Sequence, residues 1–475
     1  MRFNSLEFYI LLLSVFVVYY AIPVRFRGGI LLVTSCVFYM AWRPEYILLI
    51  LFSVGVDYGV AMGMERFHRT RARKLLLFLS LASNLGLLVF FKYVGLIADS
   101  LRKALAILHL RVEIPDLEIL LPVGISFYTF QALSYTIDVY RGTTRAERSF
   151  TRLFLYVMFF PQLVAGPIER STHLLPQFSK VVTFDYSRVS SGFRLILWGL
   201  IKKVAIADRL ALLVDPVFDH VEAHSGLLLL LATYGFAFQI YADFSAYSDI
   251  ARGSARVLGF DLTDNFNSPY TARSIPEFWR RWHISLSTWF RDYVYIPLGG
   301  NRKGPVCRCI NLMVTFILSG VWHGANWTFV VWGAYHGLFY IVSVLTRDRM
   351  AKLGRRFGLP ACPGWLQSLA TFHIVLVGWV FFRAGTVGEA AWILSQVGTV
   401  HSSAGISLSL ILEQIPLLVA LVLLLVVDLQ RKREPFDSFL GRWPVLGRWS
   451  AYVVGALLLL NVPSEVAVPF IYFQF

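Results

Sequence analysis

Apolar runs that are long enough to cross a bilayer as helices recur along almost the whole of this 475-residue sequence. A membrane-spanning helix needs about 20 mostly apolar residues, and no polar interval between the runs looks long enough for a soluble domain. We therefore predict an all-α integral membrane protein with about 10–12 transmembrane helices, plus re-entrant or interfacial helices, in a single multi-span domain over residues 1–475. The runs begin near 7–23, 29–43, 46–63, 75–98, 119–139, 190–213, 225–247, 310–322, 327–346, 366–383, 410–428 and 449–468.

The composition excludes the other broad classes of protein. Apolar residues make up 57% of the chain and charged residues 15%, whereas a soluble domain is about 45–50% apolar and about 25% charged. A soluble enzyme, a disordered chain and a secreted disulfide scaffold are therefore excluded. Of the four cysteines, Cys307 and Cys309 form a C-x-C pair, and no second pair follows at zinc-site spacing. We predict no metal site.

The net charge of +15 would suggest nucleic acid as the partner of a soluble protein. In a membrane protein, cytoplasmic loops collect Lys and Arg, and the sequence contains no nucleic-acid-binding motif. We therefore interpret the excess of Lys and Arg as a signal for the orientation of the helices in the membrane, and we predict no nucleic-acid partner. With the amino terminus outside, the basic clusters at 25–27, 66–74 and 141–152 all fall in the cytoplasm.

A polar and aromatic stretch, residues 261–309, interrupts the apolar runs. Ser274 and Glu277 form a capping box, which predicts a helix over about 275–292. Its tryptophans and arginines are typical of a helix lying in the membrane interface. An interfacial helix does not explain His283, which lies among them.

His323 follows the apolar run 310–322 and precedes the next predicted span. Gly320, Gly324 and Ala325 beside it allow a close backbone approach. An ionisable side chain at this depth is costly, which favours a functional role, and the alternative is a hydrogen-bonded histidine in a helix interface. We interpret His336 and His373 as packing residues.

Other polar residues lie inside the apolar segments. Gln239, Asp243 and Tyr247 are spaced by four and share a helix face. Asp249 and Arg252, three apart, can form a pair. Such groups either line a polar tunnel or hold helices together, and the sequence leaves both readings open.

Several motifs are absent. The chain has no G-x-x-x-x-G-K-[ST] for nucleotide phosphates, no G-x-S-x-G and no H-E-x-x-H. ATP-driven transport, serine hydrolysis and zinc proteolysis therefore lose support. No internal repeat is apparent, which argues against a transporter built from inverted halves.

The sequence resembles the membrane-bound O-acyltransferase family. The resemblance rests on long stretches that occur in one order, with a core motif region over about 119–384. These stretches are LPVGISFYTFQALSYTIDVYR (121–141), FFPQLVAGPIER (159–170), GLIKKVAIADRLA (199–211), FQIYADFSAYSDIARG (238–253), FWRRWHISLSTWFRDYVYIPLGGNR (278–302), LSGVWHGANWTFVVWGAYHG (318–337), GWVFFRA (378–384) and the final FIYFQF.

The resemblance implies a ring of helices around a thin centre, with a cytoplasmic and a periplasmic funnel. His323 matches the family's essential histidine, and His283 matches its second histidine. We expect His323 to act as the catalytic base, while His283 or Asn326 orients the donor or stabilises the oxyanion. The remaining candidates for the substrate or donor channel are Trp282, Arg280, Arg281, Asp243 and Arg302, with Lys303 as a further contact to donor phosphates.

The expected function is O-acetyl transfer across the bacterial inner membrane, from a cytoplasmic thioester to an exported polysaccharide such as alginate. We expect no bound cofactor, because acetyl-CoA or an acyl-carrier thioester would be the donor substrate. The expected partners are membrane lipids, a periplasmic SGNH-type acetyltransferase or another polysaccharide-modification protein, and a cytoplasmic acyl carrier. The alternatives are transfer of D-alanyl or another acyl group to a cell-envelope polymer, transport of an acetyl donor or a lipid-linked sugar, and a structural scaffold.

Overall fold

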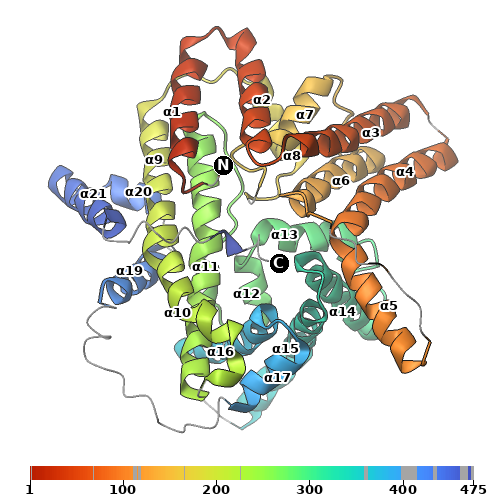
Figure 1. Cartoon of the computed structure of the whole chain (residues 1–475), viewed down its shortest axis with the longest axis vertical. Coiled ribbons are helices and arrows are strands. Elements are labelled where there is room, and N and C mark those ends of the chain that lie inside the picture. The colour runs from red at the N-terminus through yellow and green to blue at the C-terminus, as the bar shows by residue number, and fades with distance from the viewer. Residues whose placement is uncertain are drawn as a thin grey trace. The chain divides into compact units, whose positions relative to one another are not determined.

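The computed structural model describes most of the chain and is helical throughout the described part (Figure 1). The described residues are 1, 3–67, 69–110, 115, 119–164, 166–224, 226–357, 362–396, 415–431, 436–460 and 469–471. Among them α-helices, 3₁₀-helices and π-helices occur without a strand. The prediction of an all-α protein is therefore confirmed.

Within the described residues, six helices are long and apolar enough to cross a membrane. They cover Pro44–Arg66, Thr70–Ile107, Gly226–Val257, Gly304–His323, Trp327–Arg347 and Gly364–Arg383. Three shorter apolar helices cover Leu6–Ala21, Leu417–Gln430 and Val445–Leu460. The predicted runs 119–139 and 190–213 also fall on helices, but on shorter or more polar ones. The total number of crossings and the ring around a thin centre stay predictions.

The chain divides into two compact units. The first contains residues 1–196 and 250–263, and the second contains residues 197–249 and 264–475. Helices α9 (Tyr186–Leu200) and α11 (Gly226–Val257) contribute residues to both.

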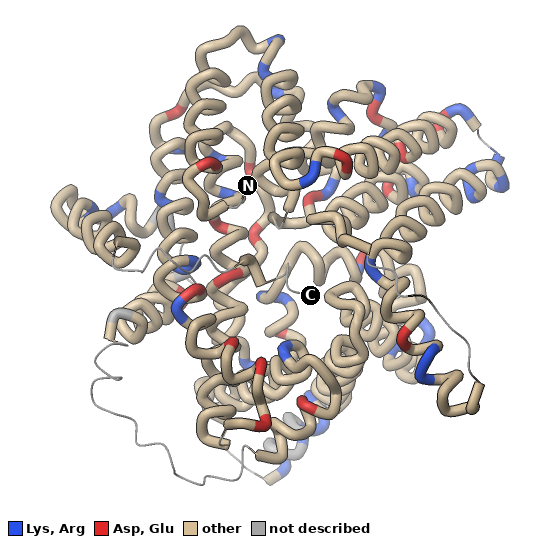
Figure 2. The backbone as a smooth tube through the Cα atoms, in the orientation of Figure 1, with Lys and Arg blue, Asp and Glu red and all other residues tan. Residues whose placement is uncertain are grey.

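The first unit is built around three helices that pack together, α3, α4 and α6 (Figure 1). In this group Asp57 accepts hydrogen bonds from Ser80 and Asn84, which satisfies a buried carboxylate. Lys and Arg gather where α3 ends and α4 begins (Figure 2), as the positive-inside rule predicts for a cytoplasmic turn. The helices are α1 (Leu6–Ala21), α2 (Val24–Met40), α3 (Ile47–Arg66), α4 (Thr70–Leu88), α5 (Val94–Ile107), α6 (Ile125–Arg141), α7 (Phe150–Met158) and α8 (Ser171–Leu174).

The second unit carries both histidines of interest. A π-helical segment, Ile201–Ala207, leads into α10. A second one, Arg291–Tyr295, follows α13. The α-helices are α10 (Asp208–Asp219), α12 (Ile275–Arg281), α13 (Ile284–Phe290), α14 (Gly304–His323), α15 (Trp327–Arg356), α16 (Gly364–Arg383), α17 (Val387–Gln396), α19 (Ile415–Arg431), α20 (Phe436–Gly441) and α21 (Val445–Leu460).

Glycines bring the backbones of α14 and α15 into contact. A Cβ atom on Gly320 would lie 2.2 Å from the carbonyl oxygen of Phe329. A Cβ atom on Gly333 would lie 2.4 Å from the carbonyl oxygen of Phe316. Any side chain at either position would force the helices apart. The close approach predicted at Gly320 is therefore confirmed.

The prediction of one helix over about 275–292 is wrong, although its start is correct. Ser274 caps α12 and accepts a hydrogen bond from the backbone of Glu277, as the capping box predicts. The helix ends at Arg281, and a new helix, α13, begins at Ile284. Between them His283 takes the left-handed conformation, with φ 43° and ψ 55°. The break gives His283 a direction that a continuous helix would not allow.

Candidate active site

His323 is the last residue of α14 and is 3% exposed. Gly324 directly after it is extended, so the helix stops there. Aromatic rings surround the imidazole, with ring centroids 4.9 Å away at Trp332, 5.0 Å at Trp322 and 5.4 Å at Phe382. The glycine contacts between α14 and α15 hold Trp332 against this histidine. The ring therefore has a fixed position in an apolar surrounding.

Asn265 holds His283 in place. Its Oδ1 accepts hydrogen bonds from the backbone nitrogen of Ser285 at 3.1 Å and from the Ser285 hydroxyl at 2.7 Å. Nδ1 of His283 lies 3.3 Å from the same oxygen. Because an amide oxygen has no hydrogen to give, Nδ1 donates and Nε2 carries the lone pair. Asn265 also supplies the backbone oxygen that accepts from Ile284, so it supports the left-handed turn and the imidazole together.

Burial keeps the imidazole of His283 neutral. The residue is 1% exposed and lies outside the candidate membrane spans. Burial lowers the pKa of His283 to about 3, because a charged ring loses its hydration there. A neutral imidazole with a defined tautomer can accept a hydrogen bond or a proton through Nε2.

The two histidines lie side by side although 40 positions separate them in the sequence. Their ring centroids are 6.4 Å apart. Trp322 contacts both rings, with its centroid 6.0 Å from that of His283. The break between α12 and α13 and the end of α14 therefore bring together the two residues that the family resemblance singles out.

A hollow of about 630 Å³ leads along α14 toward this pair. Ile284, directly after His283, lines it, and so does Ser319, one helical turn before His323. Three guanidinium-bearing residues, Arg280, Arg291 and Arg308, also line it. Most of the remaining wall is aromatic, aliphatic or hydroxyl-bearing, including Trp279, Phe290, Leu312, Phe316, Ser287, Thr288, Thr315, Tyr295 and Tyr340. The hollow thus combines a set of cations with a mostly uncharged wall.

The other predicted channel residues divide between this hollow and structural roles. Arg280 lines the hollow, whereas Arg281 pairs with Glu277 and donates to the Thr271 hydroxyl. Trp282 is 1% exposed in a cluster of aromatic rings that includes Trp379. Arg302 and Lys303 are exposed and lie outside the lining.

Asn326 is occupied as a helix cap. Its Nδ2 donates to the carbonyl oxygen of Gly385 at 2.8 Å, and its Oδ1 accepts from the backbone nitrogen of Thr328 at 3.1 Å. Thr328 lies in the first turn of α15, so the side chain satisfies one of the helix's unpaired N–H groups. Both ends of the amide therefore have structural partners.

Asp243 belongs to a buried group of charges. Lys203 lies between two carboxylates, with its Nζ 2.9 Å from Asp243 and 2.8 Å from Asp208. The backbone nitrogen of Ile471 donates to the other oxygen of Asp243 at 2.7 Å. Of the two roles that the sequence left open, these contacts match the one that holds helices together.

Sequence reasoning missed four residues of the site. Asn265 gave no signal because its partners lie 18 and 20 positions further on. Arg291 and Arg308 were visible as basic residues, but the π-helical segment that follows α13 was not. Lys203 lies in one of the quoted motifs, and its place between two acidic residues depends on tertiary contacts.

Comparisons with known proteins identify the family of this chain. Residues 145–375 match the model of the membrane-bound O-acyltransferase family, MBOAT. The chain is 41% identical over 397 residues to the probable alginate O-acetylase AlgI of Pseudomonas aeruginosa, a match that covers 82% of this chain and 74% of the relative. It is 34% identical over 390 residues to the peptidoglycan O-acetyltransferase of Helicobacter pylori, a match that covers 77% of this chain and 72% of the relative. It is 27% identical over 275 residues to the teichoic acid D-alanyltransferase of Bacillus subtilis, a match that covers 55% of this chain and 68% of the relative.

The matched region contains both histidines and the hollow beside them. Together with the apolar helices, the relatives show a multi-pass bacterial membrane protein with acyltransferase activity. The chain belongs to the membrane-bound O-acyltransferase family.

Proposed function

We propose that this acyltransferase moves an acetyl group from a cytoplasmic thioester to a hydroxyl group of an exported polysaccharide such as alginate, across the inner membrane. The observation that carries the proposal is the hollow of about 630 Å³ that runs along α14 to the turn before His323. Relatives that are named for alginate and for peptidoglycan O-acetylation support acetyl as the group and a cell-envelope polymer as the acceptor.

The lining of the hollow suits a phosphopantetheine thioester, either coenzyme A or an acyl carrier. Such a donor has phosphate at one end and a slender, mostly uncharged arm ending in the thioester. Arg280, Arg291 and Arg308 can bind the phosphate through charge-assisted hydrogen bonds. Arg308 belongs to the basic stretch 302–308, which the positive-inside rule predicts to be cytoplasmic. The arm would then point along α14 toward Ser319 and His323.

In the reaction His323 takes the proton of the attacking hydroxyl group. The hydroxyl oxygen bonds to the carbonyl carbon, the carbon–sulfur bond breaks, and the departing thiolate receives the proton from the imidazolium. The products are an acetyl ester and a free thiol. In the tautomer set by Asn265, His283 presents a lone pair, so it orients a donor or acceptor N–H or O–H and does not donate to the oxyanion.

The proposal includes two protein partners. A cytoplasmic acyl carrier would deliver the thioester when free coenzyme A is not the donor. Where the attacking hydroxyl belongs to a periplasmic SGNH-type acetyltransferase and not to the sugar, that partner would carry the acetyl group on to the polysaccharide. A hydrocarbon layer of about 30 Å separates the cytoplasmic donor from the exported acceptor, which leaves a role for a partner on each side.

The test measures transfer or hydrolysis of radiolabelled acetyl-CoA by the full-length protein in nanodiscs. His323→Ala and His323→Gln should lower the rate by about 10²–10⁴-fold, the range typical of a general base. His220→Ala, a change at an exposed histidine directly after α10, is the matched control and should retain the full rate. Size-exclusion profiles and thermal unfolding should be the same for all variants.

Three outcomes would contradict the proposal. Full activity of His323→Ala would show that another group removes the proton. Activity with a D-alanyl thioester but not with acetyl-CoA would assign the protein to D-alanyl transfer. Movement of acetyl-CoA across proteoliposomes without cleavage of the thioester would make it a carrier.

A further inference from the structure

A second hollow, of about 490 Å³, lies in the first unit, whereas the histidine pair belongs to the second. The segment that follows α8 forms most of its wall, and the turn after α11 closes it. His173, Gln177, Lys180, Arg188 and Asp261 line it. The proposed acetyl transfer does not use this hollow.

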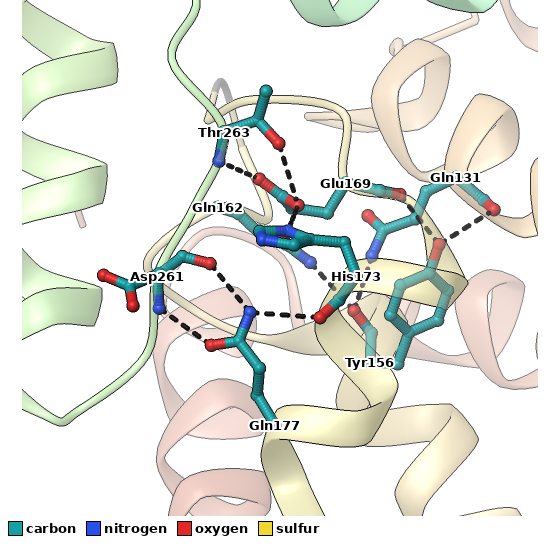
Figure 3. A network of polar contacts seen from close by, with 8 residues as sticks. All are labelled: Gln131, Tyr156, Gln162, Glu169, His173, Gln177, Asp261 and Thr263. Carbon is teal, nitrogen blue, oxygen red and sulfur yellow. Dashed lines mark hydrogen bonds and ion pairs between the residues drawn. The ribbon is translucent and has the colours of Figure 1, made fainter.

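A network of polar contacts, drawn in Figure 3, includes three residues that line this hollow, His173, Gln177 and Asp261. The Glu169 side chain is fully buried, and one of its oxygens lies 2.7 Å from Nδ1 of His173. The same carboxylate accepts hydrogen bonds from the backbone nitrogen and the hydroxyl of Thr263. Gln177 donates to the backbone oxygen of Asp261 at 2.9 Å and accepts from its backbone nitrogen at 2.8 Å. The wall is therefore pre-formed and does not need a ligand to assemble.

Basic groups exceed acidic groups around the hollow. The hydrogen bond to Glu169 raises the pKa of His173, so the imidazolium is favoured. Asp261 faces Arg256 at 4.0 Å. Among the residues that the structure describes, none bonds the ammonium group of Lys180. The basic groups are His173, Lys180, Arg188, Arg256 and Arg27, and the acidic groups are Glu169, Asp185 and Asp261.

The rim of the hollow has the character of a membrane interface. Val181 lines the hollow and is 67% exposed, and Phe184 and Tyr186, which follow it closely in the sequence, are 57% and 77% exposed. Exposed aromatic residues beside cations are typical of the level of the lipid headgroups. Arg27, which the positive-inside rule predicts to be cytoplasmic, donates to the backbone oxygen of Val182 in the wall. The hollow is therefore expected at the headgroup level of the cytoplasmic leaflet.

We propose that this hollow binds the phosphate of an anionic phospholipid headgroup from the cytoplasmic leaflet, with Lys180 and Arg188 as its cationic ligands. That leaflet carries the anionic lipids that attract basic residues near its surface. Arg188 is oriented by hydrogen bonds to the hydroxyl of Tyr20 and to the backbone oxygen of Thr183, and Lys180 is available for the ligand. The exposed apolar rim would contact the first carbons of the acyl chains.

The experiment titrates the full-length protein in a neutral detergent with three probes. The probes are short-chain phosphatidylglycerol, short-chain phosphatidylcholine and inorganic phosphate, and the readout is the shift in thermal unfolding temperature. Phosphatidylglycerol should raise this temperature with saturation, and the other two should not. Lys180→Gln should lower the affinity for phosphatidylglycerol about fivefold, and the double variant Lys180→Gln with Arg188→Gln should lower it about 25-fold. Each basic residue near an anionic surface contributes about 1 kcal/mol to binding.

Arg71→Gln with Lys74→Gln is the matched control, because it removes two charges from another predicted cytoplasmic segment outside the hollow. This control should bind the lipid like the unaltered protein. Lys180→Gln alone keeps the test valid if the Arg188 variant does not fold. Binding of phosphatidylglycerol unchanged by Lys180→Gln would overturn the proposal. Equal shifts with inorganic phosphate would also overturn it, because they would indicate a soluble phosphate ligand.

Discussion

His283 and His173 occupy opposite surroundings within one chain. His283 is 1% exposed and donates to a neutral amide oxygen, while His173 is exposed and faces the buried carboxylate of Glu169. Burial lowers the pKa of His283 to about 3, and the hydrogen bond to Glu169 raises the pKa of His173. The surroundings therefore shift the pKa of the two imidazoles in opposite directions.

The lysines of the two units differ in the same way. The Lys203 side chain is 2% exposed and lies between the carboxylates of Asp208 and Asp243. Lys180 is exposed at a hollow. A buried cation needs opposite charges to offset the loss of hydration, and an exposed cation does not. Partner and burial therefore have to be considered together at each basic residue.

The largest effect is expected from Lys203→Met. The change leaves two buried carboxylates without this cation, so the free energy of unfolding should fall by about 3–5 kcal/mol. Lys180→Met, the matched change at the exposed lysine, should alter it by no more than about 0.5 kcal/mol. Denaturant titration in detergent measures both values. Similar losses for the two variants would break the contrast between the buried and the exposed lysine.

The next effect is expected from Asn265→Asp, which gives His283 the kind of partner that His173 has. A carboxylate raises the pKa of the imidazole, so His283 becomes protonated at a higher pH than in the unaltered protein. Acetyl transfer should fall by about 10²-fold, and the limb of the rate profile that reports the neutral imidazole should move to higher pH. Asn267→Asp, an exposed change two residues away, is the control. An unchanged pH profile would show that the partner of His283 has no bearing on the reaction.

The smallest effect is expected from Glu169→Gln, the reverse exchange of partners. The pKa of His173 is higher in the folded protein than in the unfolded chain, where it is about 6.5. The ion pair with Glu169 therefore contributes fully to stability below pH 6.5, and this contribution is lost as the pH rises through the pKa that His173 has in the folded protein. The variant should lose about 1 kcal/mol at low pH and progressively less at higher pH. Thermal unfolding across pH measures this, with Glu222→Gln at an exposed site as the control. A loss that did not depend on pH would mean that the hydrogen bonds to Thr263 account for it.

Local patterns in the sequence predicted the elements that local physics determines. The apolar runs predicted helices, Ser274 and Glu277 predicted the start of α12, and Gly320 predicted the close approach of α14 and α15. His283 and His323 were singled out by the resemblance to the membrane-bound O-acyltransferase family, which rests in part on the motifs around them. In each case the signal lies within a few neighbouring positions.

Contacts between distant residues were not predictable in this way. The break at His283 depends on Asn265, which satisfies the N–H groups at the start of α13 from 18 or more positions upstream. Arg308 joins Arg280 in one hollow because two separate helices line it. Charge and spacing show that such residues exist, and packing alone decides which of them meet.

The glycine contacts between α14 and α15 also close one side of His323 to an acyl group. Two backbones whose atoms are already in contact at Gly320 and Gly333 leave no gap for a hydrocarbon tail. A lipid in the surrounding bilayer therefore has no sideways entry between these helices. The hollow beside α14 stays open to the proposed donor, and its course along the helix suits a thin extended arm.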